Sequence, residues 1–216
     1  MSPDLYTLLQ ESSARHSHLC PRQVLGVRLG LAGLAALELE APINKQTGLV
    51  IIETDGCFAD GVKVATGAAI GHRTLRVNDF GKTAATFVDV KTERAIRVAP
   101  LLDIRQRASA YLPNEERHYF AQLEGYQIIP DEEMFQYQEV ILQPSLKALL
   151  SKPNMRANCE YCGEEIMNER EVVMNGSTLC LSCANQGYYL LKSASVEMCE
   201  LISNQSRTHL KNIVSP

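Results

Sequence analysis

Residues Val24–Leu37, VLGVRLGLAGLAAL, form the most informative segment of this chain of 216 residues. The segment is rich in Ala and Leu, which favour a helix. Gly26, Gly30 and Gly33 recur at spacings of four and three, so they share one side of that helix. Glycine inside a helix costs about 0.5–1 kcal/mol relative to alanine, so three on one side indicate a face against which a sheet or another helix packs closely. The alternatives are that the helix merely tolerates them, or that this side is a homodimer interface.

Patterned segments surround this helix on both sides. A short amphipathic helix is predicted over Asp4–Ser13, a β-branched strand over Gly48–Glu53 and a helix over Ala59–Ala68. The remaining expected elements are strands at Leu75–Val77, Ala84–Val90, Arg94–Val98 and Gln136–Leu142, helices at Leu101–Ala110 and Glu115–Leu123, and a turn at Lys91–Glu93. The fold class expected is therefore α+β, a mixed helix and antiparallel-sheet core domain followed by a small treble-clef zinc-binding domain.

The composition changes between Gln143 and Ala157, where Pro, Ser, Lys and Asn cluster. This change places a domain boundary there, with a core domain over residues 1–150 and a smaller zinc-finger domain with its tail over 151–216. The last residues, Asn204–Pro216, are polar enough to fray. A domain of about 150 residues buries enough surface to fold without disulfides or metal.

Composition and charge exclude several classes of protein. The net charge is −4, and 45% of the residues are hydrophobic, which is typical of a globular protein. The longest nearly apolar segment is too short for the roughly 18–20 residues that cross a bilayer, so no membrane contact is expected. The first residues lack the basic cluster and apolar run of a signal peptide, which favours the cytoplasm and reduced thiols.

Two CxxC pairs form the most specific motif of the sequence. Cys159 and Cys162 are separated from Cys180 and Cys183 by 17 residues, a spacing typical of a structural zinc site. Tetrahedral zinc is held by four thiolates in many such sites. We therefore predict zinc bound by all four cysteines, the alternatives being a redox dithiol or unliganded thiols. Cys199 is outside the motif and is expected to be a small buried hydrophobe.

The residues between the two CxxC pairs indicate how the chain turns back. Asn175-Gly176 is a strong hairpin signal between Glu171–Met174 and Ser177–Leu179, because both turn residues accept positive φ. Cys180 would then begin a helix running through Gln186. A knuckle, a hairpin and a helix carrying the second ligand pair constitute a treble clef.

The charge of the zinc module argues against nucleic-acid binding. From Lys152 onward the chain has six Lys and Arg residues and seven Asp and Glu residues. Phosphate binding derives its affinity from clustered cations, and this module has no net excess of them. Contact with a protein partner or reinforcement of a dimer is therefore the expected role.

A second set of chemically reactive residues lies at His16-Ser-His18-Leu-Cys20-Pro21. Alternate residues of an extended segment project the same way, and His16 and Cys20 also share a face in a helix. Pro21 suits the first position of the following helix, which places Cys20 where the free N–H groups favour a thiolate. The alternative is a buried cysteine beside surface histidines.

A matching cluster follows the strand that ends near Glu53. The segment reads Glu53-Thr-Asp55-Gly-Cys57-Phe-Ala-Asp60, at the carboxyl end of a strand leading into a helix, where ligand-binding groups often gather. Asp55 is a candidate helix cap, and Cys57 would lie in the first turn, another electropositive position for a thiolate.

These segments together resemble the E-subunit family of formylmethanofuran dehydrogenase. The resemblance is carried by HSHLCP, LGVRLG, ETDGCFADGVKVATG, NDFGKTAATF and the CxxC pairs, in family order from His16 to Tyr188. It implies an α+β core, sometimes followed by a treble-clef zinc finger, and a homodimer. The family is named after operons of the molybdenum or tungsten enzyme that reduces carbon dioxide onto methanofuran, and many relatives occur in organisms without that pathway.

The resemblance also implies site residues. Its His-x-His-x-Cys-Pro motif falls on His16, His18, Cys20 and Pro21, and its acidic-and-cysteine motif falls on Glu53, Asp55, Cys57 and Asp60; the Gly-Lys pair is Gly81-Lys82. Two departures stand out, Ala68 in place of a third cysteine and Arg22 in place of a glycine. A mechanism with three cysteines is therefore unavailable.

Three functions remain open from the sequence. In the first, His16, His18, Cys20 and Cys57 provide ligands for a second metal ion in an accessory or stand-alone subunit associated with molybdenum or tungsten oxidoreductase subunits. In the second, the zinc finger contacts a protein partner and the core cluster is vestigial. In the third, Cys20, Cys57 and His18 serve a thiol-dependent enzyme acting on a small acyl or aldehyde substrate. Redox cycling between Cys20 and Cys57 competes with metal binding.

Overall fold

The computed structural model describes residues 4–14, 16–143, 145–150 and 154–189. The chain divides into two compact units, Met1–Leu150 and Ser151–Pro216, and each is treated by itself below. The expectations for Cys199 and for Asn204–Pro216 lie outside the described residues.

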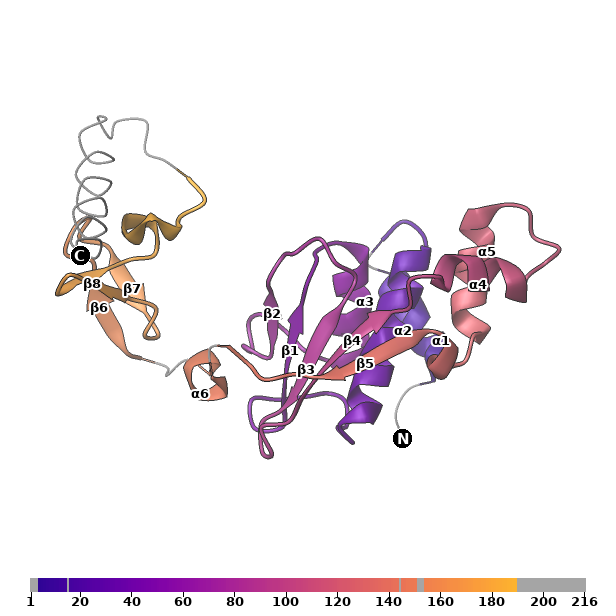
Figure 1. Ribbon diagram of the computed structural model, residues 1–216, viewed down its shortest axis with the longest axis horizontal. Coiled ribbons are helices and arrows are strands. Elements are labelled where there is room, and N and C mark those ends of the chain that lie inside the picture. Colours follow the sequence, from indigo (N-terminus) through magenta and orange to yellow (C-terminus); the bar gives the residue numbers. More distant parts are fainter. Residues whose placement is uncertain (1–3, 15, 144, 151–153, 190–216) are drawn as a thin grey trace, which may run out of the picture. The chain divides into compact units, whose positions relative to one another are not determined.

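The first unit is built on a five-stranded sheet of order β2-β1-β3-β4-β5 (Figure 1). The strands are β1 (Gly48–Ile52), β2 (Leu75–Val77), β3 (Ala85–Asp89), β4 (Ala95–Pro100) and β5 (Phe135–Glu139). Three neighbouring pairs are antiparallel, as predicted, and β1 with β2 is parallel. The parallel pair arises because a helix, α3, connects β1 to β2, and a helical crossover returns the chain in the same direction.

Helices pack against one face of this sheet and confirm the α+β class. They are α1 (Leu5–Ser13), α2 (Pro21–Ala36), α3 (Cys57–Thr66), α4 (Ile104–Tyr111) and α5 (His118–Ile128). The inward side chains of β1, Val50 and Ile52, share one apolar core with Val27 of α2 and Val62 of α3. In the described parts of the chain, none of the helices is long and apolar enough to span a membrane.

The opposite face of the sheet carries a smaller apolar cluster. Leu49 and Ile51 of β1 alternate with the residues that face the main core, and they pack with Leu146 and Leu149. The latter two belong to the short helix α6 (Leu146–Leu149), which ends the first unit. The sheet is therefore buried on both faces near β1.

The glycine side of α2 is a surface of close backbone approach, as predicted. A Cβ atom at Gly26 would overlap the carbonyl oxygen of Phe58, and one at Gly61 of α3 would lie 2.8 Å from the backbone nitrogen of Val27. A Cβ atom at Gly30 would lie 2.7 Å from that of Ala65. Real Cβ atoms do not approach so closely, so only glycine allows this separation of α2 and α3.

The third glycine of the same side faces the sheet. A Cβ atom at Gly33 would overlap the ring of Phe87 on β3. All three glycines thus serve packing within one chain. The alternative that this side forms a homodimer interface is wrong, because α3 and the sheet already cover it.

The second unit contains two small hairpins. They are β6 (Arg156–Asn158) with β7 (Glu165–Met167), and β8 (Val172–Met174) with β9 (Ser177–Leu179). The second hairpin confirms the Asn-Gly prediction, since Asn175 and Gly176 have φ values of 51° and 85°. The first hairpin was not predicted. The predicted helix after Cys180 is wrong in form, being a single irregular turn over Ser182–Gln186 that Asn185 interrupts with φ 59°.

The close approach of α2 and α3 leads to a first prediction. Gly26→Ala should lower the free energy of unfolding by about 1–3 kcal/mol, because the added methyl group forces the two backbones apart. Gly71→Ala is the matched control, since no atom lies within 4 Å of its added Cβ, and it should change stability by less than about 0.5 kcal/mol. Chemical denaturation measures both. Equal effects of the two substitutions would contradict the packing described.

Candidate metal and thiol sites

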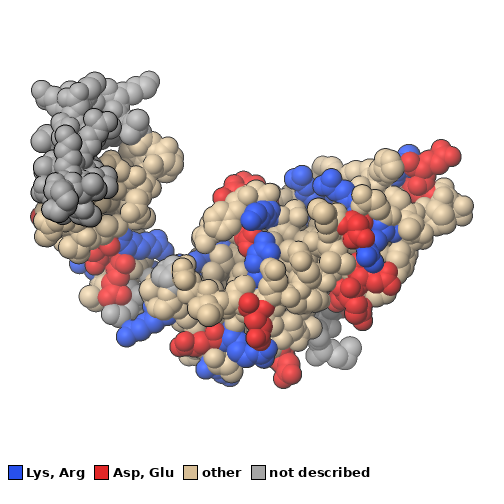
Figure 2. Space-filling model, in the orientation of Figure 1, with Lys and Arg blue, Asp and Glu red and all other residues tan. Residues whose placement is uncertain are grey.

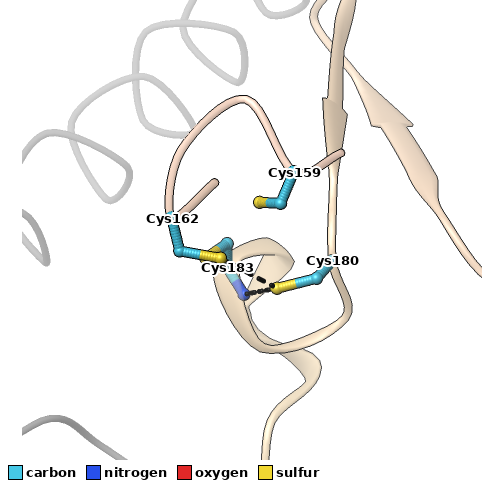
Figure 3. Close-up of side chains that lie close together, drawn as sticks. All are labelled: Cys159, Cys162, Cys180 and Cys183. Carbon is cyan, nitrogen blue, oxygen red and sulfur yellow. Dashed lines mark hydrogen bonds between the residues drawn. The ribbon is translucent and has the colours of Figure 1, made fainter. Parts of the chain in front are cut away.

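The second unit contains a group of four cysteines (Figure 3). The sulfur atoms of Cys159, Cys162, Cys180 and Cys183 all lie within 4.8 Å of one another. The Sγ atoms of Cys162 and Cys180 are 4.0 Å apart. Zinc with four thiolates at about 2.3 Å would separate neighbouring sulfurs by about 3.8 Å, so the four side chains fit a tetrahedral zinc ion.

The two hairpins place these cysteines. Cys159 directly follows β6, and its N–H donates to the Glu164 carbonyl over 2.9 Å, which closes the turn that carries Cys162. The N–H of Glu160 donates to the Thr178 carbonyl of β9 over 2.9 Å and so joins the hairpins. Cys180 follows β9 directly. The grip is therefore local, because each CxxC pair lies at the end of a hairpin strand.

Backbone N–H groups point toward the sulfurs. The N–H groups of Cys162 and Cys180 lower the pKa of Cys159 to about 6. The N–H of Cys183 donates to the Sγ of Cys180 over 3.4 Å. Burial and the neighbouring sulfurs raise the pKa of Cys183, a penalty that a bound dication would offset. Four soft sulfur donors with supporting N–H groups are the donor set that structural zinc prefers.

A pair of thiols lies in the core domain. Cys20 is the N-cap residue of α2, directly before Pro21 as predicted, and Cys57 is the first residue of α3. The two side chains interact through a hydrogen bond, although 36 residues separate them in the sequence. The convergence of these two sequence-predicted residues follows from the packing of α2 on α3.

The electrostatics of Cys57 differ from the expectation. Burial raises its pKa, and the hydrogen bond and the like charge of Cys20 raise it further. The helix terminus does not compensate. The expectation that this first-turn position favours a thiolate is therefore wrong for Cys57, because desolvation of the charged form outweighs the free N–H groups. Asp55 is also not the helix cap, since Gly56 occupies that position.

The two predicted histidines lie differently. Nε2 of His16 is 2.9 Å from Oδ2 of Asp60, one turn after Cys57 on α3, and both side chains are partly buried. His18 is exposed, and its Nδ1 lies 3.0 Å from the hydroxyl of Ser17. Within the described ranges, the core domain has no group of three or more His, Cys, Asp or Glu ligand atoms as compact as that of the four cysteines. The structure thus brings the two thiols together and places His16 beside them through Asp60.

Two residues near the thiols were not expected from the sequence. The first is Tyr119 on α5, whose hydroxyl donates to the Leu19 carbonyl over 3.4 Å. Burial raises the pKa of Tyr119, and the charges of Cys20 and Cys57 raise it further, so its hydroxyl faces the thiol pair. Tyr119 is on a helix about a hundred residues away from Cys20, and a single sequence holds no signal of that proximity.

Gln23 is the second unexpected residue and fixes the start of α2. Its Oε1 accepts from the N–H of Cys20 over 2.8 Å, and its Nε2 donates to the Ser12 carbonyl of α1 over 2.9 Å. The side chain is completely buried. Gln23 therefore positions Cys20 against α1, and a glutamine three residues after a cap residue is the signal that could have identified it.

Glu53 is not part of this site. Its carboxylate pairs with Arg97 of β4 through two hydrogen bonds of 2.6 and 2.7 Å and is buried. Successive strand residues face opposite sides of a sheet, and Ile52 faces the helices, so Glu53 faces away from them. Glu53 stabilises the sheet, and Arg97, whose pKa this pairing raises, balances its charge.

Comparison with known proteins gives two family matches. The model described as "FmdE, Molybdenum formylmethanofuran dehydrogenase operon" matches residues 15–149. The model described as "Prokaryotic dksA/traR C4-type zinc finger" matches residues 155–188. The second match covers all four cysteines of the compact group, so the module is a four-cysteine zinc finger.

Two individual proteins are similar over most of the chain. A protein of Archaeoglobus fulgidus named "Probable S-adenosyl-L-methionine-binding protein" is 32% identical over 206 residues, covering 85% of this chain and 54% of that protein. The chain thus spans about half the length of this relative. The crystal structure of a tungsten formylmethanofuran dehydrogenase (FmdE)-like protein from Syntrophus aciditrophicus has a TM-score of 0.54 at 22% identity, covering 88% of this chain and 96% of that one.

The role of Gln23 leads to a second prediction. Gln23→Ala should lower the free energy of unfolding by about 1–3 kcal/mol, because the buried Cys20 N–H and Ser12 carbonyl lose their partners. Gln46→Ala removes an exposed side chain of the same type and should stay within about 0.5 kcal/mol of the wild type. Thermal and urea unfolding measure both values. A Gln23 variant as stable as the Gln46 variant would show that this amide does not fix α2.

Proposed function

The chain belongs to the FmdE family, and from this premise we propose that it is an accessory or free-standing metal-binding protein whose core domain holds a second metal ion at Cys20 and Cys57. The zinc finger would serve structure or partner contact. The core ion would serve the reaction or the delivery of metal to a catalytic subunit. We place this protein in the cytoplasm, where its cysteines stay reduced.

The convergence of the two thiols supports this proposal more than any other observation. They come from different helices and meet at the amino-terminal ends of both. Two neighbouring thiolates repel each other, and a soft divalent cation between them removes that repulsion. His16 lies next to the pair through its contact with Asp60, and a histidine that contacts a carboxylate is the usual arrangement for a metal ligand.

The ligand set that we propose is Cys20 and Cys57 with one histidine of the His16–His18 segment. Three protein ligands leave one position of a tetrahedral ion open, as in catalytic zinc sites. A metal held in this way supplies a Lewis acid for a carbonyl oxygen or a bound water. The hydroxyl of Tyr119, which faces the thiols, is placed to donate a hydrogen bond to a group bound there.

Redox cycling of the thiol pair is a second candidate, favoured by the same proximity. The two cysteines are free thiols and already in contact, so a disulfide needs no rearrangement of the helices. Its formation would remove two electrons and two protons from the pair, which requires an external oxidant. Metal binding is preferred because it also accounts for the His16–Asp60 pair.

For the zinc finger we propose a treble-clef arrangement and contact with a protein partner. The charges on this protein are mixed, and Lys and Arg side chains are interspersed with Asp and Glu over the face drawn in Figure 2. Such a surface lacks the clustered cations that nucleic acids require. Candidate partners are a second copy of the chain and subunits of a molybdenum or tungsten oxidoreductase, as the family's operon association suggests.

Counting metal ions per chain tests the proposal as a third prediction. The wild type should bind about two ions, Cys57→Ser one and Cys183→Ser one, because each variant removes a ligand from only one site. The double variant should bind none. Inductively coupled plasma mass spectrometry of the full chain, purified with zinc and desalted, gives the counts, and Ser17→Ala is the control that should keep both ions.

One ion in both the wild type and Cys57→Ser would remove the core metal. The thiol pair could then still cycle, and treatment with diamide would decide that. A mass decrease of about 2 Da in the wild type that is absent from Cys57→Ser would support the redox candidate.

A further inference from the structure

A cavity of about 440 Å³ lies beside the amino-terminal ends of α2 and α4. Its volume falls within the range of small-molecule sites. It is lined by Pro21, Arg22, Leu25, Thr83, Pro100, Leu101, Leu102, Ile104, Arg105, Gln106, Gln122 and Tyr126. None of the functions considered so far uses this cavity.

The lining has a one-sided charge. Arg22 and Arg105 contribute two guanidinium groups, and Asp and Glu are absent from the lining. Neither arginine forms an ion pair with a carboxylate among the residues that the structure describes. By contrast Arg107, in the same helix as Arg105, is paired with Asp103 over 2.8 Å. The cavity therefore has uncompensated positive charge where a ligand would lie.

The remaining walls suit the apolar part of an organic molecule. Leu25 and Ile104 are buried side chains, and Leu102 is fully exposed at the cavity. Arg105 is oriented by a hydrogen bond with the hydroxyl of Tyr126, which itself lies 3.3 Å from Oε1 of Gln122. A guanidinium held in this way is arranged to accept a carboxylate or phosphate at lower entropic cost.

The cavity adjoins the Cys20–Cys57 pair along two paths. Arg22 follows Cys20 after a single residue, in the first turn of α2. On α5, Tyr119, Gln122 and Tyr126 are spaced by three and four residues and so share one helix face. Tyr119 faces the thiols, whereas the other two line the cavity. One face of α5 thus runs from the thiol pair to the arginines.

We infer that this cavity binds a small organic anion, with its carboxylate or phosphate group between Arg22 and Arg105 and its apolar part on Leu25 and Leu102. The binding itself needs neither thiols nor metal. It rests on the proposed function in one respect, namely that the bound anion is the compound presented to the site at Cys20 and Cys57.

Four probes with one ring and different charges test the inference. Phenyl phosphate and benzoate are anions, benzyl alcohol is neutral and benzylamine is a cation. Amide chemical shifts of the full-length protein, titrated with each probe, give the dissociation constants and the residues that respond. Both anions should bind at least tenfold more tightly than benzyl alcohol, benzylamine should bind most weakly, and the ratio of phosphate to carboxylate affinity identifies the preferred anionic group.

Substitutions separate this cavity from other surfaces, as a fourth prediction. Arg22→Gln and Arg105→Gln should each weaken the anions at least fivefold and leave benzyl alcohol within twofold. Arg22→Lys, which keeps the charge but loses the forked donors, should lie between wild type and Arg22→Gln. Arg94→Gln removes the same charge from an arginine outside the cavity and should stay within twofold.

The outcomes distinguish this inference from the proposed function. Cys57→Ser should retain anion binding within twofold even though it loses the core metal. Equal binding of the neutral and anionic probes, or equal losses in the Arg94 and Arg22 variants, would overturn the inference. Either result would leave the metal count per chain, and therefore the proposed function, unaffected.

Discussion

The core domain depends on the close contact between α2 and α3, which only glycine permits. Gly26 meets Phe58 and Gly61, and four residues later Gly30 meets Val62 and Ala65. The contacts advance along both helices in the same direction, so the helices run parallel and their amino-terminal ends lie together. Cys20 and Cys57 occupy those ends. The pairing of two thiols that are distant in sequence is thus a consequence of backbone packing, and a side chain at Gly26 would alter the site as well as the core.

The sequence predicted features that depend on local spacing and missed those that depend on distant contacts. The CxxC spacing and the Asn-Gly turn suffice for the zinc module, because both ligand pairs lie at the ends of short hairpin strands. The glycine spacing in α2 predicted a packed face correctly. Tyr119 could not be found, since no local pattern links α5 to the start of α2. Arg22 was visible only as a departure from the family, and its partner across the cavity, Arg105, lies on α4.

Alternation along β1 explains why Glu53 was misleading. The resemblance places Glu53 in the same motif as Cys57, but one further residue along a strand turns a side chain to the other face of the sheet. There Glu53 is neutralised by Arg97, and the site on the helical side keeps Asp60 instead, beside His16. The two sites therefore differ in origin. Four sulfurs gathered by local turns form the zinc site, whereas two sulfurs gathered by tertiary packing, beside a cationic cavity, form the core site.

The central claim is that this packing creates a metal site at Cys20 and Cys57. Anomalous diffraction at the zinc absorption edge, from crystals of the full chain grown with zinc, tests it most directly. The account predicts two anomalous peaks per chain, one among the four cysteines of the finger and one bonded to the sulfurs of Cys20 and Cys57. A single peak at the finger, with the two core thiols ordered and only in contact with each other, would contradict it.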